Sequence, residues 1–221
     1  MTDTARVEPD LPRRGALSVE EIVAVALGLV RRDGIGTLTM RRLADELGVT
    51  PMAVYHHLPN KQELLRRVVE RVGADLHMPH DGRPWIDQVR DYALRWREEL
   101  HRHPGVAGYL LTQDGPPATA MRVIDDAVGL LMESGFAERD AARAYAALAS
   151  FVLARVDLEE TLARIGPRDE ETPPLEAVLP GGHEVNIGRV MGYLHELSDD
   201  DHFAYTLDRL LDGIEATRPR P

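Results

Sequence analysis

Apolar residues recur at intervals of three and four along most of this chain, and this spacing constrains the fold more than any other feature. Such a period places apolar side chains on one face of an α-helix. The clearest case lies between residues 85 and 100, where five apolar side chains share one face: Trp85, Val89, Tyr92, Trp96 and Leu100. No stretch of any length alternates apolar and polar residues as a half-buried strand does. The sequence therefore predicts an all-α fold.

Capping residues and loop signals divide the chain into units. Four residues precede periodic apolar runs and can cap the first free N–H groups of a helix: Ser18, Thr39, Thr50 and Asn60. Longer helices are expected over residues 85–100, 117–134, 138–165 and 199–216, with a proline- and glycine-rich loop over 166–183. We expect a flexible arm (1–16), a three-helix unit joined through a fourth helix (17–76), and a larger helical unit (77–221).

Composition and charge exclude several classes of protein. The chain of 221 residues has no cysteine, so neither a disulfide framework nor a thiolate zinc site is available. It has no apolar run long enough to span a membrane and no secretory signal, so we expect a cytoplasmic protein. The net charge is −11, yet residues 13–72 hold ten Lys or Arg and seven Asp or Glu. A mildly basic unit on an acidic body is consistent with a local anionic partner, although the charge count alone favours an ordinary mixed surface.

The most informative segment covers residues 38–61, LTMRRLADELGVTPMAVYHHLPNK. A helix, a turn containing Gly48 and a second short helix form the pattern of a helix-turn-helix. Because a helix turns by about 100° per residue, an inward Val54 keeps Leu58 inward as well. The outward face then carries no formal charge: Met52, Ala53, Tyr55, His56 and His57. Such a face is suited to base edges and thymine methyl groups in a major groove. The alternative is that Tyr55 and the histidines only cover a neighbouring helix.

Polar and cationic residues surround this face. Lys61 begins the next helix, where its ammonium group and the free N–H groups both favour a phosphate. The hydroxyls of Thr39 and Thr50 are placed to reach phosphates, and Arg41 is suited to a guanine edge or a phosphate. Arg13 and Arg14 either enter a minor groove or belong to a solvated tail.

The segment from Leu17 to about Leu76 resembles the DNA-binding domain of the tetracycline-repressor (TetR) family. The match centres on Leu43-Ala44, Gly48-Val49, Tyr55-His56-His57 and Asn60-Lys61, and the rest of the chain resembles the family's C-terminal domain more loosely. The resemblance implies a homodimeric transcriptional regulator, usually a repressor, that binds a palindromic operator and is released by a small-molecule effector. Activation is the other option. The DNA contacts of the family map onto Thr39, Arg41, Met52, Ala53, Tyr55, His56, His57 and Lys61.

The larger unit supplies candidates for an effector pocket and a dimer interface. Residues that mix aromatic, soft and polar groups are candidate ligand contacts: Tyr92, Trp96, His101, His103, Met121, Asp125, Tyr145 and Arg155. For each of them a place in the core or on the surface is the alternative, and Asp125 and Arg155 are equally suited to pair with each other. Apolar stripes on two helices are candidates for the dimer interface: Leu148, Phe151, Val152, Phe203, Leu207, Leu210 and Ile214. The same stripes suit an intrachain core.

Two other functions were weighed against a DNA-binding regulator. An enzyme is disfavoured because the chain has no nucleophile elbow, phosphate loop or metal motif, and no cofactor is expected. Metal binding by His183, His195 and His202 is disfavoured, because their spacing does not fit a helical ligand pair. An all-helical dimeric scaffold or small-molecule-binding protein explains the apolar stripes but leaves the uncharged face around Tyr55 without a purpose.

Overall fold

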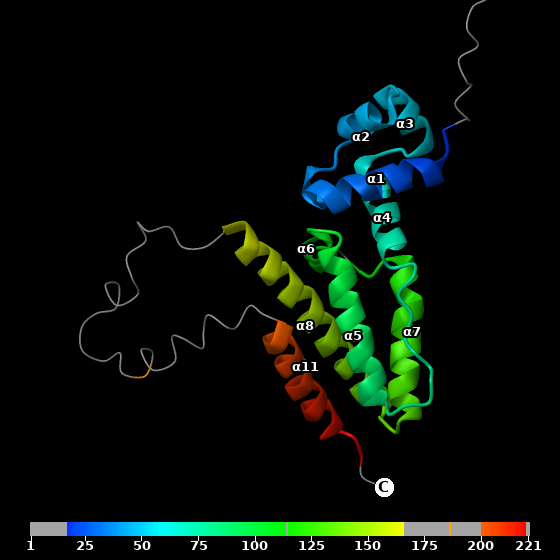
Figure 1. The fold of residues 1–221 in the computed structure, drawn as a ribbon. Coiled ribbons are helices and arrows are strands. Elements are labelled where there is room, and N and C mark those ends of the chain that lie inside the picture. Colours follow the sequence, from blue (N-terminus) through cyan, green and yellow to red (C-terminus); the bar gives the residue numbers. More distant parts are fainter. Residues whose placement is uncertain (1–16, 114, 166–185, 187–199, 220–221) are drawn as a thin grey trace, which may run out of the picture.

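The computed structural model describes residues 17–113, 115–165, 186 and 200–219, and these residues contain helices and turns but no strand (Figure 1). The N-terminal unit comprises α1 (Val19–Asp33), the short 3-10 helix η1 (Ile35–Thr37), α2 (Met40–Leu47) and α3 (Pro51–His57). Helix α4 (Lys61–Val72) leads into the body, which comprises α5 (Trp85–His101), α6 (Val106–Leu111), α7 (Ala118–Glu133), α8 (Glu138–Ile165) and α11 (Asp200–Glu215). The all-α prediction is confirmed. The expected arm and the loop over 166–183 lie outside the described residues.

The predicted capping residues explain where the first four helices begin. The side chains of Ser18 and Asn60 accept hydrogen bonds from backbone N–H groups three residues later, at 3.1 and 2.8 Å. Thr39 and Thr50 cap α2 and α3 in the same way, at 3.1 and 3.3 Å. Gly48 ends α2 with a φ of 65°, a left-handed conformation that glycine adopts at no steric cost. Local sequence therefore sets the helix-turn-helix geometry.

The two units have cores of fully buried aliphatic side chains. In the N-terminal unit, Leu43 of α2 and Val54 of α3 are completely buried and hold the two helices together. In the body, Trp85 packs edge-on against Phe136, with ring centroids 5.2 Å apart. The Trp85 indole N–H also donates to Glu215 of α11, which fastens the last helix to the start of α5. Each buried large side chain contributes about 1.5–3 kcal/mol, so these contacts define the fold.

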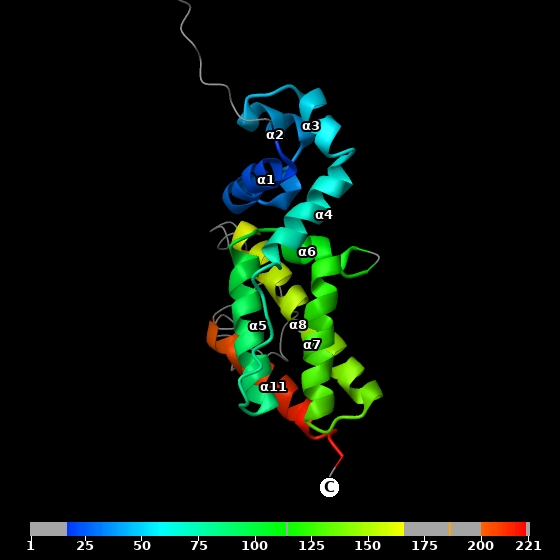
Figure 2. The same cartoon turned by 90° about the vertical axis from the view of Figure 1, so that its right-hand side faces the viewer.

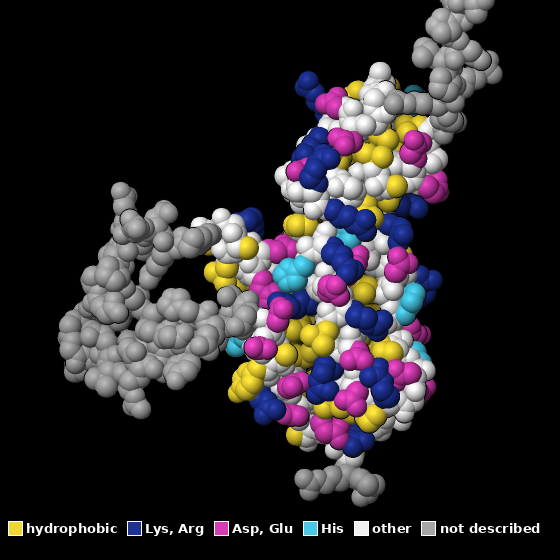
Figure 3. Space-filling view, viewed as in Figure 1, with side chains coloured by type: hydrophobic (Ala, Val, Ile, Leu, Met, Phe, Trp, Pro, Cys, Tyr) yellow, Lys and Arg dark blue, Asp and Glu magenta, His cyan; other side chains and the backbone are white. Residues whose placement is uncertain are grey.

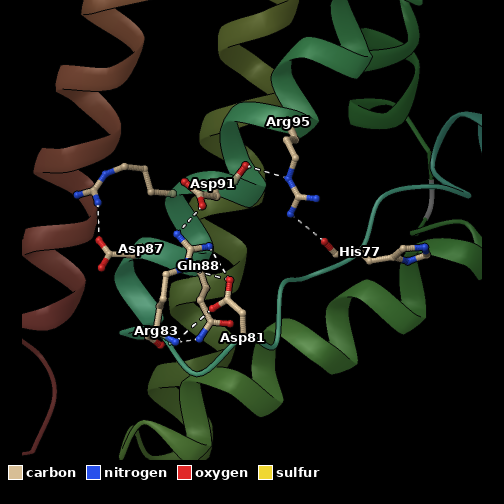
Figure 4. Close-up of polar contacts among 8 residues, drawn as sticks. His77, Asp81, Arg83, Asp87, Gln88, Asp91 and Arg95 are labelled. Carbon is tan, nitrogen blue, oxygen red and sulfur yellow. Dashed lines mark hydrogen bonds and ion pairs between the residues drawn. The ribbon is translucent and has the colours of Figure 1, made fainter.

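Helix α4 joins the two units, and Figure 2 shows it leading from beneath α3 into the body near α6 and α7. From α4, residues 73–84 run beside α5 to its first residue, Trp85, and ion pairs hold this segment in place (Figure 4). Arg83 pairs with Asp81 and Asp91, both at 2.7 Å, and Arg95 donates to the His77 carbonyl. The hydrogen bonds from Arg83 lower the pKa of Asp81.

A second connection between the units is formed by the turn between α5 and α6. The Ile35 N–H donates to the Pro104 carbonyl at 2.8 Å, and Arg31 Nε of α1 donates to Nε2 of buried His103 at 2.9 Å. Since arginine only donates, His103 accepts at Nε2, and its Nδ1–H donates to the Glu99 carbonyl. Burial lowers the pKa of His103, which keeps the ring neutral for this bond. The N-terminal unit is therefore held at two places, by α4 and by His103.

Candidate functional sites

The outward face of α3 is exposed at the end of the molecule that lies farthest from the body (Figure 1). Val54 is fully buried, whereas Met52 and Tyr55 are 65% and 44% exposed. His56 and His57 are exposed as well, and Ala53 is half-buried. The inward and outward sides of α3 are therefore those that the helical rotation predicts. Tyr55 does not serve as cover for a neighbouring helix among the described residues.

The cations of the N-terminal unit differ in whether they are paired. Arg66 and Arg67 are held by Glu63, and Arg42 is held by Asp33. The paired Glu63 has its pKa lowered to about 2 by the hydrogen bonds from Arg66 and Arg67. By contrast, Arg41 and Lys61 are exposed and make no ion pair with any described residue. Arg41 lies in the first turn of α2 and Lys61 in the first turn of α4, so both are available to an external anion.

The body encloses an apolar cavity of about 320 Å³ bounded by α4 to α8. Val69 and Val72 of α4 form one wall, and Tyr92, Trp96 and Tyr145 supply aromatic surface. In the described part of the chain, no carboxylate, imidazole or cationic side chain lines this cavity. It adjoins a more polar hollow between α4 and residues 113 and 115–117, which is lined in part by Asn60, Gln62 and Arg66. A cavity that is mostly apolar with a few polar groups has the character of a small-molecule site.

Three of the predicted ligand contacts lie at this cavity: Tyr92, Trp96 and Tyr145. The other predicted contacts lie elsewhere: His101, His103, Met121, Asp125 and Arg155. His103 is turned toward α1, and Met121 and Asp125 are exposed on α7. Arg155 pairs with Glu159 at 2.8 Å instead of Asp125, and His101 bonds the same carboxylate. A helical period does not show which neighbour a buried polar group meets, so it could not place these residues relative to the cavity.

The cavity residues that sequence reasoning missed come from α4, α6, α7 and α8 and from the segments that connect these helices. Val69 and Val72 of α4 and Val106 and Leu110 of α6 were not among the predicted ligand contacts. At six residues, α6 is too short to show an apolar period. The only available signal was that residues 106–111, VAGYLL, are nearly all apolar.

The predicted dimer stripes are largely buried within one chain. Val152 of α8 and Phe203 and Leu207 of α11 have almost no exposed surface, and the rings of Phe151 and Phe203 stack at 5.2 Å. Leu148 and Ile214 are also buried, while Phe151 and Leu210 are half-buried. Phe151 and Phe203 join α8 to α11 inside one protomer, and Leu148 and Val152 line a small apolar space with residues of α5 and α7. Both arrangements correspond to the intrachain alternative. The exposed apolar residues of these helices are different ones: Leu158, Leu162, Ile165 and Tyr205.

Charged residues of both signs lie interspersed over the rest of the surface that Figure 3 shows. Among the described residues, no helix is long and apolar enough to cross a bilayer. The described residues also contain no group of three or more His, Asp or Glu side chains placed to hold a metal ion. Of the three histidines weighed for a metal site, His183 and His195 lie outside the described residues.

Comparisons with known proteins identify the family. The model for bacterial regulatory proteins of the tetR family matches residues 22–68, and the model for the tetracyclin repressor-like C-terminal domain matches residues 78–218. The HTH-type transcriptional repressor DrrR1 of Streptomyces coeruleorubidus is 29% identical over 96% of this chain and 82% of its own length.

Solved structures agree with this match. Apo ActR from Streptomyces coelicolor superimposes with a TM-score of 0.78 at 26% identity, covering 92% of this chain and 97% of that one. A TetR variant from Acinetobacter baumannii AYE in complex with minocycline has a TM-score of 0.73 at 26% identity, covering 91% and 95%. The chain therefore belongs to the tetracycline-repressor (TetR) family of DNA-binding, ligand-responsive transcriptional repressors.

Proposed function

We propose that two copies of this chain bind a palindromic operator in the cytoplasm through α3, and that a ligand in the body's cavity releases them. The observation that carries the proposal is the exposed, uncharged face of α3 at the outer end of the molecule. An ordinary solvated face would carry Lys, Glu or Gln, whereas Met52, Tyr55 and His56 suit base edges and methyl groups. The chain acts as a regulator and not as an enzyme.

The residues of the DNA interface divide into two roles. Met52, Ala53, Tyr55, His56 and His57 read bases, because they lie on or beside the outward face of α3. Thr39, Arg41, Thr50 and Lys61 contact the backbone or the groove edge. Thr39 and Thr50 keep their capping bonds while their hydroxyls can still donate to a phosphate. Arg41 and Lys61 give up no ion pair with a described residue when they bind.

Replacing Lys61 by Ala is expected to weaken binding to all duplexes alike. The Lys61 ammonium at the start of α4 displaces counterions from a DNA phosphate. Its removal therefore lowers the slope of log K, the DNA-binding constant, against log salt concentration by about one unit per protomer. The measurement is a titration of operator and random duplexes at several salt concentrations. Arg67→Ala is the matched control, because Arg67 is already paired with Glu63. A loss confined to the operator would contradict the phosphate role.

Ligand release follows from the place of the cavity. Val69 and Val72 of α4 line it, and α4 is continuous with the turn that holds α3. A ligand that binds better when α4 has shifted pulls the equilibrium toward that arrangement. His103 and Pro104 hold α1 to the body at the same time, so a shift of α4 turns the N-terminal unit about this second contact. The spacing of two α3 helices on one operator then changes.

The dimer interface is proposed on the exposed side of α8, extended by Tyr205 of α11. Leu158, Leu162 and Ile165 recur on one face of α8, and the exposed residues preceding them on that face are small: Ala147, Ser150 and Ala154. Small residues followed by large aliphatic ones let two helices approach closely and bury apolar surface. Figure 3 shows apolar side chains at the surface on the side of the body where α8 and α11 lie.

Replacing Leu162 by Glu is expected to raise the dimer dissociation constant at least about 100-fold. In a two-fold interface each protomer contributes one introduced glutamate, so two carboxylates would be buried on association. The cost of burying each of them opposes dimerisation. Analytical ultracentrifugation over a range of concentrations measures the effect. Leu94→Glu is the matched control, since Leu94 is an exposed leucine on α5. Equal dimerisation of the two variants would place the interface elsewhere.

The experiment that tests the proposed function is genomic footprinting with the purified, ligand-free chain. The expected result is protection of a few sites with two-fold symmetry and half-sites about one helical turn apart. A scaffold or a ligand-binding protein without DNA-binding activity would protect no site. That result would overturn the proposal.

A further inference from the structure

One side-chain contact between the N-terminal unit and the body pairs an arginine with an imidazole. His103 has no exposed surface, and its Nε2 accepts from Arg31 Nε at 2.9 Å. Arg31 makes no ion pair with any described residue, whereas the neighbouring Arg32 pairs with Asp33 and Glu46. Among the described residues, the Arg31 guanidinium therefore has the His103 ring as its only hydrogen-bond partner.

This hydrogen bond exists only while the His103 ring is neutral. A protonated imidazole has two N–H donors and no acceptor, and arginine only donates, so the two side chains cannot bond once the ring gains a proton. Two positive charges would then face each other across the same gap. The contact is made by the neutral ring and lost by the protonated one.

The groups around His103 keep the ring neutral near pH 7. Burial has the largest effect and holds the pKa of His103 below its ordinary value of about 6.5. The Glu99 carboxylate lies 3.3 Å from Nδ1 and favours the protonated ring, whereas Arg31 and Arg102 oppose protonation. On the side of α8, the Glu160 carboxylate accepts a backbone N–H of the same turn at 2.7 Å. Carboxylates and cations thus face this turn from α1, α5 and α8.

Loss of the His103 contact would leave the N-terminal unit less constrained. The backbone bond from Ile35 to Pro104 lies beside it, but no other side-chain hydrogen bond joins α1 or η1 to the body among the described residues. Helix α3 belongs to the same unit as α1, so freedom at α1 is also freedom of the helix that we propose to read the operator. A dimer must place both α3 helices at once, and ordering them on DNA then costs binding free energy.

We propose that His103 is a positioning residue for operator binding: its neutral ring fixes the N-terminal unit through Arg31, and protonation of the ring frees that unit, so operator affinity falls as the pH falls. The inference rests on the proposed function, since it requires that α3 binds the operator in the arrangement that this contact holds. The fixed arrangement has the lower pKa, so it is favoured above about pH 6.5 and loses this advantage as the pH falls below that value. Each protomer takes up at most one proton, which limits the effect to about tenfold per pH unit for each protomer.

Two variants of Arg31 separate positioning from a simple loss of charge. In Arg31→Gln the amide can donate to a neutral ring and accept from a protonated one, so a contact persists at either pH. In Arg31→Ala the contact is absent at either pH. Both variants remove the same positive charge, so their electrostatic attraction to DNA changes equally. We expect the operator dissociation constant of Arg31→Ala to be at least about threefold higher than that of Arg31→Gln at pH 7.5.

The pH response is the second readout, measured by fluorescence anisotropy with labelled operator at pH 7.5 and pH 6.0. Over this interval the dissociation constant of the unmodified chain should rise at least about threefold more than that of Arg31→Gln. His103→Gln should behave like Arg31→Gln, because a glutamine oxygen accepts from arginine without titrating. Arg31 is exposed, so Arg31→Gln carries the test even if His103→Gln does not fold.

Arg32→Gln is the matched control for the pH response. Arg32 is the neighbouring exposed arginine of α1 and is paired with carboxylates, so this variant should keep the pH response of the unmodified chain. His56 and His57 on α3 are present in all of these proteins, so their response to pH is common to every comparison. Equal pH responses of the unmodified chain and Arg31→Gln, or equal operator affinities of Arg31→Gln and Arg31→Ala, would overturn the inference.

A measurement without DNA separates this inference from the proposed function. The chain has no cysteine, and a Cβ added at Gly28 of α1 meets no neighbouring helix within 4 Å, so Gly28→Cys gives one spin-label site per protomer. Pulsed EPR on the dimer should give a broader distribution of label distances at pH 6.0 than at pH 7.5, and adding Arg31→Gln should remove the broadening. A distribution that does not respond to pH would overturn the inference. A chain that protects no site in footprinting fails the proposed function, whereas one that binds its operator without the expected pH response fails this inference alone.

Discussion

A Tyr55→Ala variant is expected to lose selectivity for the operator while it keeps its dimer and its helix content. Tyr55 is exposed on the outward face of α3, where it offers an aromatic ring and a hydroxyl. Removing a good base contact costs about 1–3 kcal/mol of discrimination for each half-site. Since a dimer uses two half-sites, selectivity over random duplex falls by a factor of roughly 30 or more.

The measurement is a competition gel shift with labelled operator and increasing random duplex. Binding to random DNA should change little, because Arg41 and Lys61 still contact phosphates. Tyr55→Phe is the matched control: it keeps the ring and separates apolar contact from hydrogen bonding by the hydroxyl. If Tyr55→Ala keeps the selectivity of the unmodified chain, the assignment of α3 as the reading helix fails.

The orientation of α3 was predictable because it depends on local rules alone. The caps Thr39, Thr50 and Asn60 set the helix starts, and a single buried Val54 fixes the rotation of a helix of seven residues. No long-range contact is needed to conclude that Tyr55 points outward. The resemblance to the TetR family then indicated that this face binds DNA.

The body was less predictable because its helices have several neighbours. An apolar stripe shows that one face is buried but not what buries it. The stripe that includes Phe203 and Leu207 packs against α8 of the same chain, and the exposed face of α8 around Leu162 is the one that we propose for the partner. His103 was placed in the pocket, although its ring instead accepts from Arg31, 72 residues earlier in the chain. Contacts between residues so far apart in the chain leave no periodic pattern in the sequence.

Glu159 of α8 is the centre of a buried charge cluster that ties three helices together. Its carboxylate accepts from Arg97 at 3.0 Å, from His101 at 2.8 Å and from Arg155 at 2.8 Å. Arg97 also pairs with Asp200 of α11 and lies 4.7 Å from the ring centroid of Phe203. The cluster therefore links α5, α8 and α11 where the predicted dimer stripe instead forms the core.

Glu159→Gln is expected to lower the free energy of unfolding by about 3 kcal/mol at pH 7. The substitution keeps the shape but removes the negative charge that Arg97 and Arg155 share, and breaking a buried pair costs about 3–5 kcal/mol. Urea denaturation at fixed protein concentration measures the loss. Glu98→Gln is the matched control, because Glu98 pairs with Arg102 at an exposed site, where such a pair contributes about 0–1 kcal/mol.

The pH dependence of stability gives a second readout for the same carboxylate. Burial alone would raise the pKa of Glu159, but the hydrogen bonds from His101 and Arg97 outweigh it and lower the pKa from 4.5 to about 2. A lowered pKa in the folded state stabilises the protein above pH 4.5, and this stabilisation disappears as the pH falls toward 2. The unmodified chain should therefore lose about 3 kcal/mol across that window from this group. The Glu159→Gln variant should lack that part of the loss, and an unchanged pH profile would show that the cluster does not hold the three helices together.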